Sequence, residues 1–245
     1  MNKFVIADKT FQSRLFMGTG HFPSNESIEE AIKTAKIEMV TAALKRLDLE
    51  NKNKDDLIRH IRRPGVHILP STSGASNAKE AILMAKMARE AFETNWIKLE
   101  IHNDPIHKLP DSFDVFEATV ELVKDGFVVL PFVQPDPLLC SRLADEGAAA
   151  VMPFGAPIGS SKGLATKELL KIIIETCRIP VVLNGGIGTP ADAAAVMEMG
   201  AGGVLVNTAI SSANNPAQMA VAFKEAIEAG RKAYLAGIVK GRVQR

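Results

Sequence analysis

The fold of this chain is indicated most clearly by the stretch Trp96-Ile97-Lys98-Leu99-Glu100-Ile101, an apolar run that contains one lysine and one glutamate. In a β-strand successive side chains point to opposite faces, so the aliphatic side chains would share one face and Lys98 and Glu100 the other. A solvated edge strand would tolerate the two charges, whereas burying them in an interior is expensive. We favour a barrel strand whose polar face lines an active site, because a desolvated lysine there can form a Schiff base with a ketone.

Short apolar runs of this kind alternate with amphipathic stretches along the whole chain. The candidate strands are residues 14–19, 39–44, 67–72, 96–101, 127–133, 150–154, 181–185 and 203–208. The candidate helices are residues 78–92, 113–124, 137–146, 166–176, 190–199 and 216–228, and Gly230 follows the last of them, where a C-terminal glycine is expected. Eight strand–helix units predict right-handed crossovers and a closed barrel of about 250 residues. We therefore expect a single (β/α)8 TIM barrel domain over residues 1–245, with an open doubly wound sheet as the alternative.

The composition is that of an ordinary globular protein, with 47% hydrophobic and 23% charged residues. A net charge of +1 argues against a surface built for nucleic acid, and no run approaches the roughly 18 apolar residues of a membrane span. The N-terminus lacks the apolar stretch of a signal peptide, so a cytoplasmic location is expected. The two cysteines and five histidines have no metal-ligand spacing. We expect no metal, no organic cofactor, no nucleic acid and no membrane.

Glycine-rich turns follow the last three candidate strands, at residues 153–161, 184–190 and 206–210. In this fold the active site lies at the C-terminal ends of the strands, and a phosphate site is often built by the loops after strands seven and eight. Glycine lets backbone N–H groups approach an anion closely, and the following helix N-terminus adds a favourable dipole. The pattern predicts a phosphorylated ligand, with the 153–161 turn closing over its sugar chain.

Many separate segments together resemble one family, the bacterial thiazole synthases of thiamin biosynthesis, over nearly the whole chain. They are residues 11–15, 18–20, 69–75, 96–100, 109–111, 128–131, 151–153, 157–160, 186–188, 206–209 and 228–231. The resemblance implies a (β/α)8 barrel that condenses 1-deoxy-D-xylulose 5-phosphate, dehydroglycine and sulfur into the thiazole phosphate of thiamin. It also implies that the sulfur arrives as a thiocarboxylate on the C-terminus of a ubiquitin-like carrier protein. We expect a homo-oligomer.

The resemblance assigns roles to particular residues of this chain. The family lysine that forms an imine with the sugar ketone falls on Lys98, and the glutamate that assists proton transfer falls on Glu100. The family's contacts to the sugar phosphate fall on Gly159, Gly185, Gly186, Asn207 and Thr208.

One position departs from the resembling family in a way that bears on activity. Asn184 stands where the family carries an aspartate, and an amide can hold a hydrogen bond but cannot accept a proton at neutral pH. We count Asn184 as a catalytic position and expect it to limit the chemistry. The main hypothesis is a lysine-dependent transferase. The alternatives are a weakly active or non-catalytic phosphosugar-binding barrel derived from that family and, less favoured, a flavin- or other phosphate-binding barrel.

Overall fold

The computed structural model describes residues 3–44, 56–104 and 106–238. Its barrel strands are β3 (Leu15–Gly18), β4 (Met39–Ala43), β5 (His67–Ser71), β6 (Trp96–Leu99), β7 (Val128–Val133), β8 (Met152–Pro153), β9 (Val182–Asn184) and β10 (Gly203–Val206). All neighbours in the order β8-β7-β6-β5-β4-β3-β10-β9 pair in parallel. A parallel bridge between Val151 and Val181 joins the two ends of this order, so the sheet closes. The (β/α)8 barrel is thereby confirmed and the open sheet is excluded.

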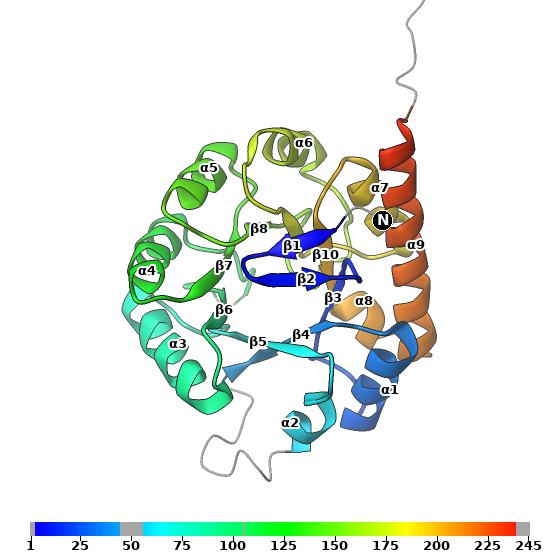
Figure 1. Cartoon of the computed structure of the whole chain (residues 1–245), viewed down its shortest axis with the longest axis horizontal. Coiled ribbons are helices and arrows are strands. Elements are labelled where there is room, and N and C mark those ends of the chain that lie inside the picture. Colours follow the sequence, from blue (N-terminus) through cyan, green and yellow to red (C-terminus); the bar gives the residue numbers. More distant parts are fainter. Residues whose placement is uncertain (1–2, 45–55, 105, 239–245) are drawn as a thin grey trace, which may run out of the picture.

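Helices surround the barrel, as Figure 1 shows. They are α1 (Asn25–Ala35), α2 (Asp56–Ile61), α3 (Ala78–Phe92), α4 (Ser112–Lys124), α5 (Pro137–Asp145), α6 (Lys167–Thr176), α7 (Pro190–Glu198), α8 (Thr208–Ser211) and α9 (Pro216–Ala236). The six helices predicted from the sequence are present. Within the described part of the chain, no helix combines the length and apolar character needed to cross a membrane.

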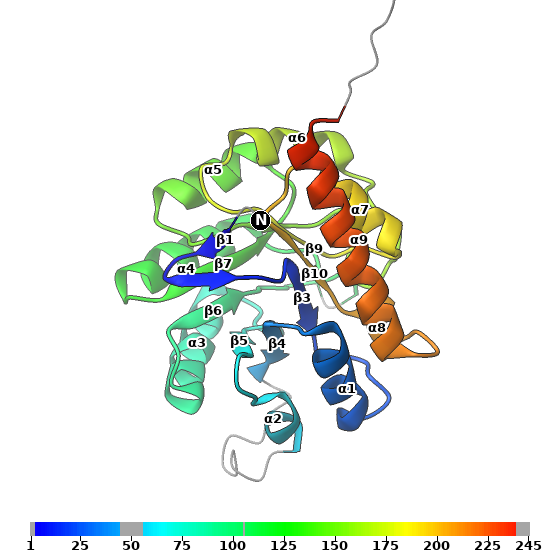
Figure 2. The same ribbon diagram turned by 45° about the vertical axis from the view of Figure 1, so that its right-hand side comes forward.

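The last helix is longer than predicted, because Gly230 does not end it. Gly230 lies inside α9 where this helix packs against α7, and a Cβ there would come within 2.3 Å of the Ala194 carbonyl oxygen. The glycine therefore serves close helix packing rather than helix termination. Figure 2 shows the resulting contact of α9 with the outside of the barrel beside α7 and α1.

The two faces of β6 contact different parts of the molecule. Ile97 and Leu99 face outward into an apolar cluster with residues of α3 and α4. Trp96 lies in a different cluster, which fills the barrel interior. Lys98 shares the inward phase of Trp96, two residues further along the strand. Because β6 pairs with both β5 and β7, it is not an edge strand, and the solvated-edge interpretation is wrong.

An antiparallel hairpin of β1 (Phe4–Ile6) and β2 (Lys9–Phe11) precedes the barrel and was not predicted. It crosses the N-terminal end of the barrel in Figure 1. Its side chains join the interior cluster, where the rings of Phe11 and Trp96 meet edge to face with centroids 6.2 Å apart. The hairpin fills the end of the barrel opposite the C-terminal ends of the strands.

Candidate active site

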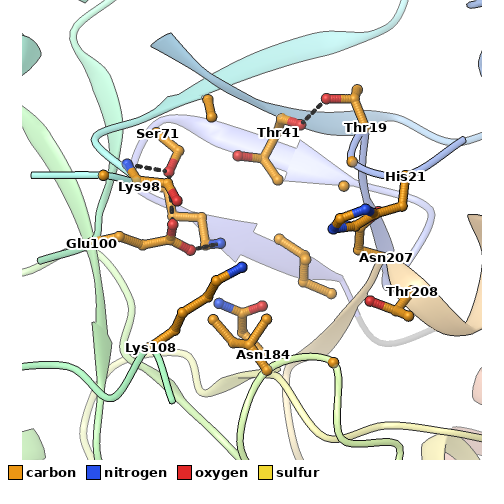
Figure 3. A pocket seen from close by; sticks show the side chains of 18 of the residues that line it. Thr19, His21, Thr41, Ser71, Lys98, Glu100, Lys108, Asn184, Asn207 and Thr208 are labelled. Carbon is orange, nitrogen blue, oxygen red and sulfur yellow. Dashed lines mark hydrogen bonds and ion pairs between the residues drawn. The ribbon is translucent and has the colours of Figure 1, made fainter. Parts of the chain in front are cut away.

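A cavity of about 740 Å³ lies at the C-terminal ends of the strands. It is lined by residues at or just beyond the ends of β3, β4, β5, β6, β8, β9 and β10. Figure 3 shows Ser71, Lys98 and Glu100 on one side of this cavity and His21, Asn207 and Thr208 on the other, with Asn184 and Lys108 between them. The cavity has the size usual for a small-molecule site.

The first side of the cavity is built around a buried ion pair between Lys98 and Glu100. Both residues are buried, with 5% and 4% of their surface exposed. The Ser71 hydroxyl donates to Glu100 Oε2 (3.1 Å). Thr72 Oγ1 holds the Glu100 backbone from both sides, donating to its carbonyl oxygen and accepting from its N–H, each at 2.8 Å. These contacts fix the carboxylate beside the amine.

The charge state of Glu100 follows from its neighbours. Burial alone would raise the pKa of this carboxyl, but the Lys98 ammonium and His102 together outweigh burial and hold the pKa well below its usual range. Glu100 is therefore an anion throughout the neutral range. Its negative charge stabilises a protonated amine on Lys98, and that amine must lose its proton before it can attack a carbonyl.

His102 extends this side of the cavity beyond the strand. Its side chain is 6% exposed, and Nε2 lies 3.7 Å from Glu100 Oε2. The ring rests edge-on against Phe132, with centroids 5.7 Å apart. Among the described residues neither ring nitrogen has a hydrogen-bond partner. His102 thereby forms part of the lining of the cavity.

The opposite side is formed where β10 passes into α8. Asn207 and Thr208 line the cavity there, and Asn207 Oδ1 is buried without a partner in the described part of the chain. Gly18 at the end of β3 makes room for Asn207, since a Cβ on this glycine would lie 2.8 Å from Asn207 Cβ. The bare backbone at Gly18 thus sets the position of the asparagine side chain.

Asn184 ends β9 and lines the cavity between the two sides. It is 4% exposed, and its Nδ2 has no partner among the residues described. Taken over the same residues, eight buried side-chain polar atoms lack a hydrogen bond, and five of them belong to residues that line this one cavity: Thr41, His102 with both nitrogens, Asn184 and Asn207. Buried polar atoms are rarely left unpaired, so this clustering indicates a site whose ligand supplies the missing partners.

The glycines predicted to bind the sugar phosphate fall into two groups. Gly159 lines the cavity, and a Cβ on it would meet nothing within 4 Å. Gly185 and Gly186 are not among the lining residues; a Cβ on Gly186 would lie 2.3 Å from the Ala156 nitrogen. Their carbonyls accept hydrogen bonds from Gly155 and Gly163. Both glycines hold the 155–163 loop in place, and a direct role in ligand binding stays a prediction.

Sequence reasoning missed several residues of the lining. Thr19 and His21 come from the turn after β3, and Lys108 comes from the loop after β6. The Gly18-Thr19-Gly20 run marked the first of these loops, because flanking glycines are typical of a close backbone turn. No comparable signal marks Lys108, whose position depends on how the loop folds back.

A closed barrel with a buried lysine–carboxylate pair at the C-terminal ends of its strands defines a (β/α)8-barrel enzyme. Comparison with known proteins then identifies the enzyme family to which the chain belongs. The sequence profile described as "Thiazole biosynthesis protein ThiG" matches residues 5–244, and the chain belongs to this family.

Individual relatives agree with this assignment. A thiazole synthase of Bacteroides fragilis is 59% identical over 238 residues, covering 97% of this chain and 92% of the relative. A thiazole synthase of Flavobacterium psychrophilum is 56% identical over 240 residues, covering 98% and 93%. A solved structure, the BexX/CysO complex of Amycolatopsis orientalis, superposes with a TM-score of 0.88 at 28% identity and covers 98% of both chains. The expected class, a thiazole synthase of thiamin biosynthesis, is confirmed.

Proposed function

We propose that this enzyme condenses 1-deoxy-D-xylulose 5-phosphate, dehydroglycine and sulfur from a thiocarboxylated carrier protein, through an imine between Lys98 and the sugar ketone. The observation that carries this proposal is the buried Lys98–Glu100 pair in the lining of the cavity. Membership of the thiazole biosynthesis family supports thiazole formation. The chemistry of the Lys98–Glu100 pair supports a route through an imine.

The imine would form by ordinary carbonyl chemistry. The ketone enters beside Lys98, and the amine attacks the carbonyl carbon once its proton has moved away. Loss of water from the resulting carbinolamine then gives the imine. Glu100 is in direct contact with Lys98 Nζ, so it can accept the proton that leaves the amine and later return it to the departing hydroxyl.

The other end of the sugar would lie across the cavity. With its ketone at Lys98, the chain of the ketose extends toward Asn207, Thr208 and Gly159. The amide of Asn207 and the hydroxyl of Thr208 offer neutral hydrogen bonds to a phosphate. Backbone N–H groups of the neighbouring loops, including those of Gly185 and Gly186, complete the proposed phosphate site.

The sulfur donor would enter from the open end of the cavity. The hairpin fills the opposite end of the barrel, so, in the part of the chain that the structure describes, the route for a peptide tail to Lys98 runs between the loops that follow the strands. The barrel with a TM-score of 0.88 was solved as a two-component complex, which supports a protein partner for this chain.

A second candidate function is a barrel that binds the phosphosugar but turns it over poorly. The observation that favours it is Asn184, a neutral amide inside the cavity. A missing general base costs about 10²–10⁴ in rate, so binding would be retained while turnover fell.

Borohydride trapping tests the proposed imine. The protein is incubated with 1-deoxy-D-xylulose 5-phosphate and sodium borohydride, and the modified peptide is located by mass spectrometry. We expect one adduct, on Lys98, which the Lys98→Ala variant loses and the Lys124→Ala variant, altered at an exposed lysine of α4, retains. An adduct on Lys108 or trapping that persists in Lys98→Ala would refute the assignment. Turnover with a thiocarboxylated carrier then distinguishes the synthase from the binding barrel.

A further inference from the structure

We propose that His102 is the base that moves protons to and from the sugar carbons after the imine has formed, with the Glu100 carboxylate stabilising the imidazolium that results. This inference rests on the proposed function and names the residue that carries out its proton transfers. It is drawn from the position of the imidazole in the cavity and from what its neighbours are able to do.

The His102 side chain is buried without hydrogen bonds. Both ring nitrogens lie in the interior with no hydrogen-bond partner among the described residues, although the side chain belongs to the cavity lining. Leaving buried polar atoms unpaired is unfavourable. A ring kept in this state is available to a ligand, and its nitrogens can accept or donate a proton there.

The other candidate groups of the cavity are less suited than His102 to accept a proton from carbon. Lys98 is consumed by the imine, and Asn184 cannot accept a proton. Glu100 is already engaged by Lys98 at Oε1 and by the Ser71 hydroxyl at Oε2, which leaves it less available to the sugar carbons. His21 and Lys108 are exposed at the mouth. His102 remains as a buried side chain whose ring nitrogens have no hydrogen bond among the described residues and can accept a proton.

His102 is positioned so that its ring faces the Glu100 carboxylate. The His102 backbone N–H donates to the Ala75 carbonyl (2.9 Å), and the ring rests against Phe132, so the imidazole is held from two sides. Nε2 is 3.7 Å from Glu100 Oε2, while Glu100 Oε1 contacts Lys98. A proton taken up by the ring would create an imidazolium facing a carboxylate, which stabilises the charged form at the moment it is needed.

The proposed step is balanced without any oxidant or reductant. In the iminium, a hydrogen on the carbon next to the imine carbon is acidic. As this C–H bond breaks, its electron pair forms a carbon–carbon double bond, the iminium nitrogen becomes neutral, and the proton passes to His102. Return of a proton from solvent by the same residue completes one exchange cycle.

Deuterium exchange tests this role without the carrier protein. The whole enzyme is incubated with 1-deoxy-D-xylulose 5-phosphate in D₂O, and label at the carbons next to the ketone is followed by NMR. We expect His102→Gln to lower the enzyme-dependent exchange rate by roughly 10²–10⁴-fold while borohydride trapping at Lys98 changes by less than about threefold. His107→Gln, in the exposed part of the same loop, should exchange like the unmodified enzyme.

Two further measurements separate catalysis from a structural effect. The pH dependence of the exchange rate in the unmodified enzyme should include an ionisation that the His102→Gln variant loses. In His102→Ala, added imidazole should restore exchange. The inference would be overturned if His102→Gln exchanged deuterium at the normal rate. It would also be overturned if substitution of His102 abolished both exchange and trapping and added imidazole did not restore exchange. Absence of exchange in the unmodified enzyme with trapping intact would also overturn it, whereas failure of trapping itself would instead defeat the proposed function.

Discussion

Replacing Glu100 by glutamine keeps the shape of the side chain and removes its charge, which leaves the Lys98 ammonium buried without its counter-charge. Exposed ion pairs contribute about 0–1 kcal/mol, but breaking a buried pair by removing one partner costs about 3–5 kcal/mol. The two residues are only 5% and 4% exposed and in direct contact, so the larger range applies. We expect Glu100→Gln to lower the free energy of unfolding by about 3 kcal/mol at pH 7.

Urea denaturation of four proteins measures this quantity: the unmodified enzyme, Glu100→Gln, Lys98→Met and the double variant. Each single variant leaves one uncompensated charge, whereas the double variant leaves none. The double variant should therefore be more stable than the sum of the two single losses predicts, with a coupling free energy of at least about 1.5 kcal/mol. Additive losses, or a loss below about 1 kcal/mol in Glu100→Gln, would show that the pair is solvated and that the reasoning from burial is wrong.

Three further predictions concern the substrate site and the far end of the barrel. Asn184→Asp should raise turnover in a reconstituted assay and add an ionisation to the pH–rate profile, with ketose-phosphate affinity within a few fold; much tighter binding without faster turnover would contradict this. Gly18→Ala should displace Asn207, because the new Cβ would lie 2.8 Å from the asparagine Cβ, and calorimetry should show a loss of about tenfold for the phosphorylated ketose but not for its dephosphorylated form. Burial, with help from Lys9, lowers the pKa of His67 to about 4 in the folded protein. The unfolded chain therefore takes up a proton at a higher pH than the folded chain does. The free energy of unfolding should accordingly fall by about 1–3 kcal/mol as the pH drops from 6.5 to 4. His67→Phe keeps a ring against Trp96 and should remove this loss of stability in acid. Urea denaturation of both proteins at pH 6.5 and at pH 4 measures the difference.

The barrel could be predicted because eight short apolar runs alternate with amphipathic stretches along the chain, and one of these runs also displays the strand period of two. In β6 this period separates Ile97 and Leu99 from Lys98, and the structure places the two groups on opposite faces as expected. The hairpin could not be predicted in the same way. Its strands are three residues long, too short for a period to show, and their apolar side chains are explained only by the barrel end that they fill.

The glycines show a different limit of sequence reasoning. A glycine marks a place where backbone must come close to something, but the sequence does not say to what. Gly186 faces Ala156, Gly230 faces Ala194, and Gly18 faces a side chain of the site itself. The position of His102 depended likewise on the path of the chain beyond β6, where the alternation of the strand no longer decides which way a side chain points.

The hairpin that fills the N-terminal end has a consequence for kinetics. In the described part of the chain, the cavity around Lys98 opens only past the loops on the other side, so every reactant would share one route in and out. A long peptide tail inserted along this route would block a sugar that arrived later. The proposed reaction should accordingly be strictly ordered, with the ketose phosphate binding first, the carrier second, and product release waiting for the carrier to withdraw. Excess carrier added before the sugar should then act as an inhibitor.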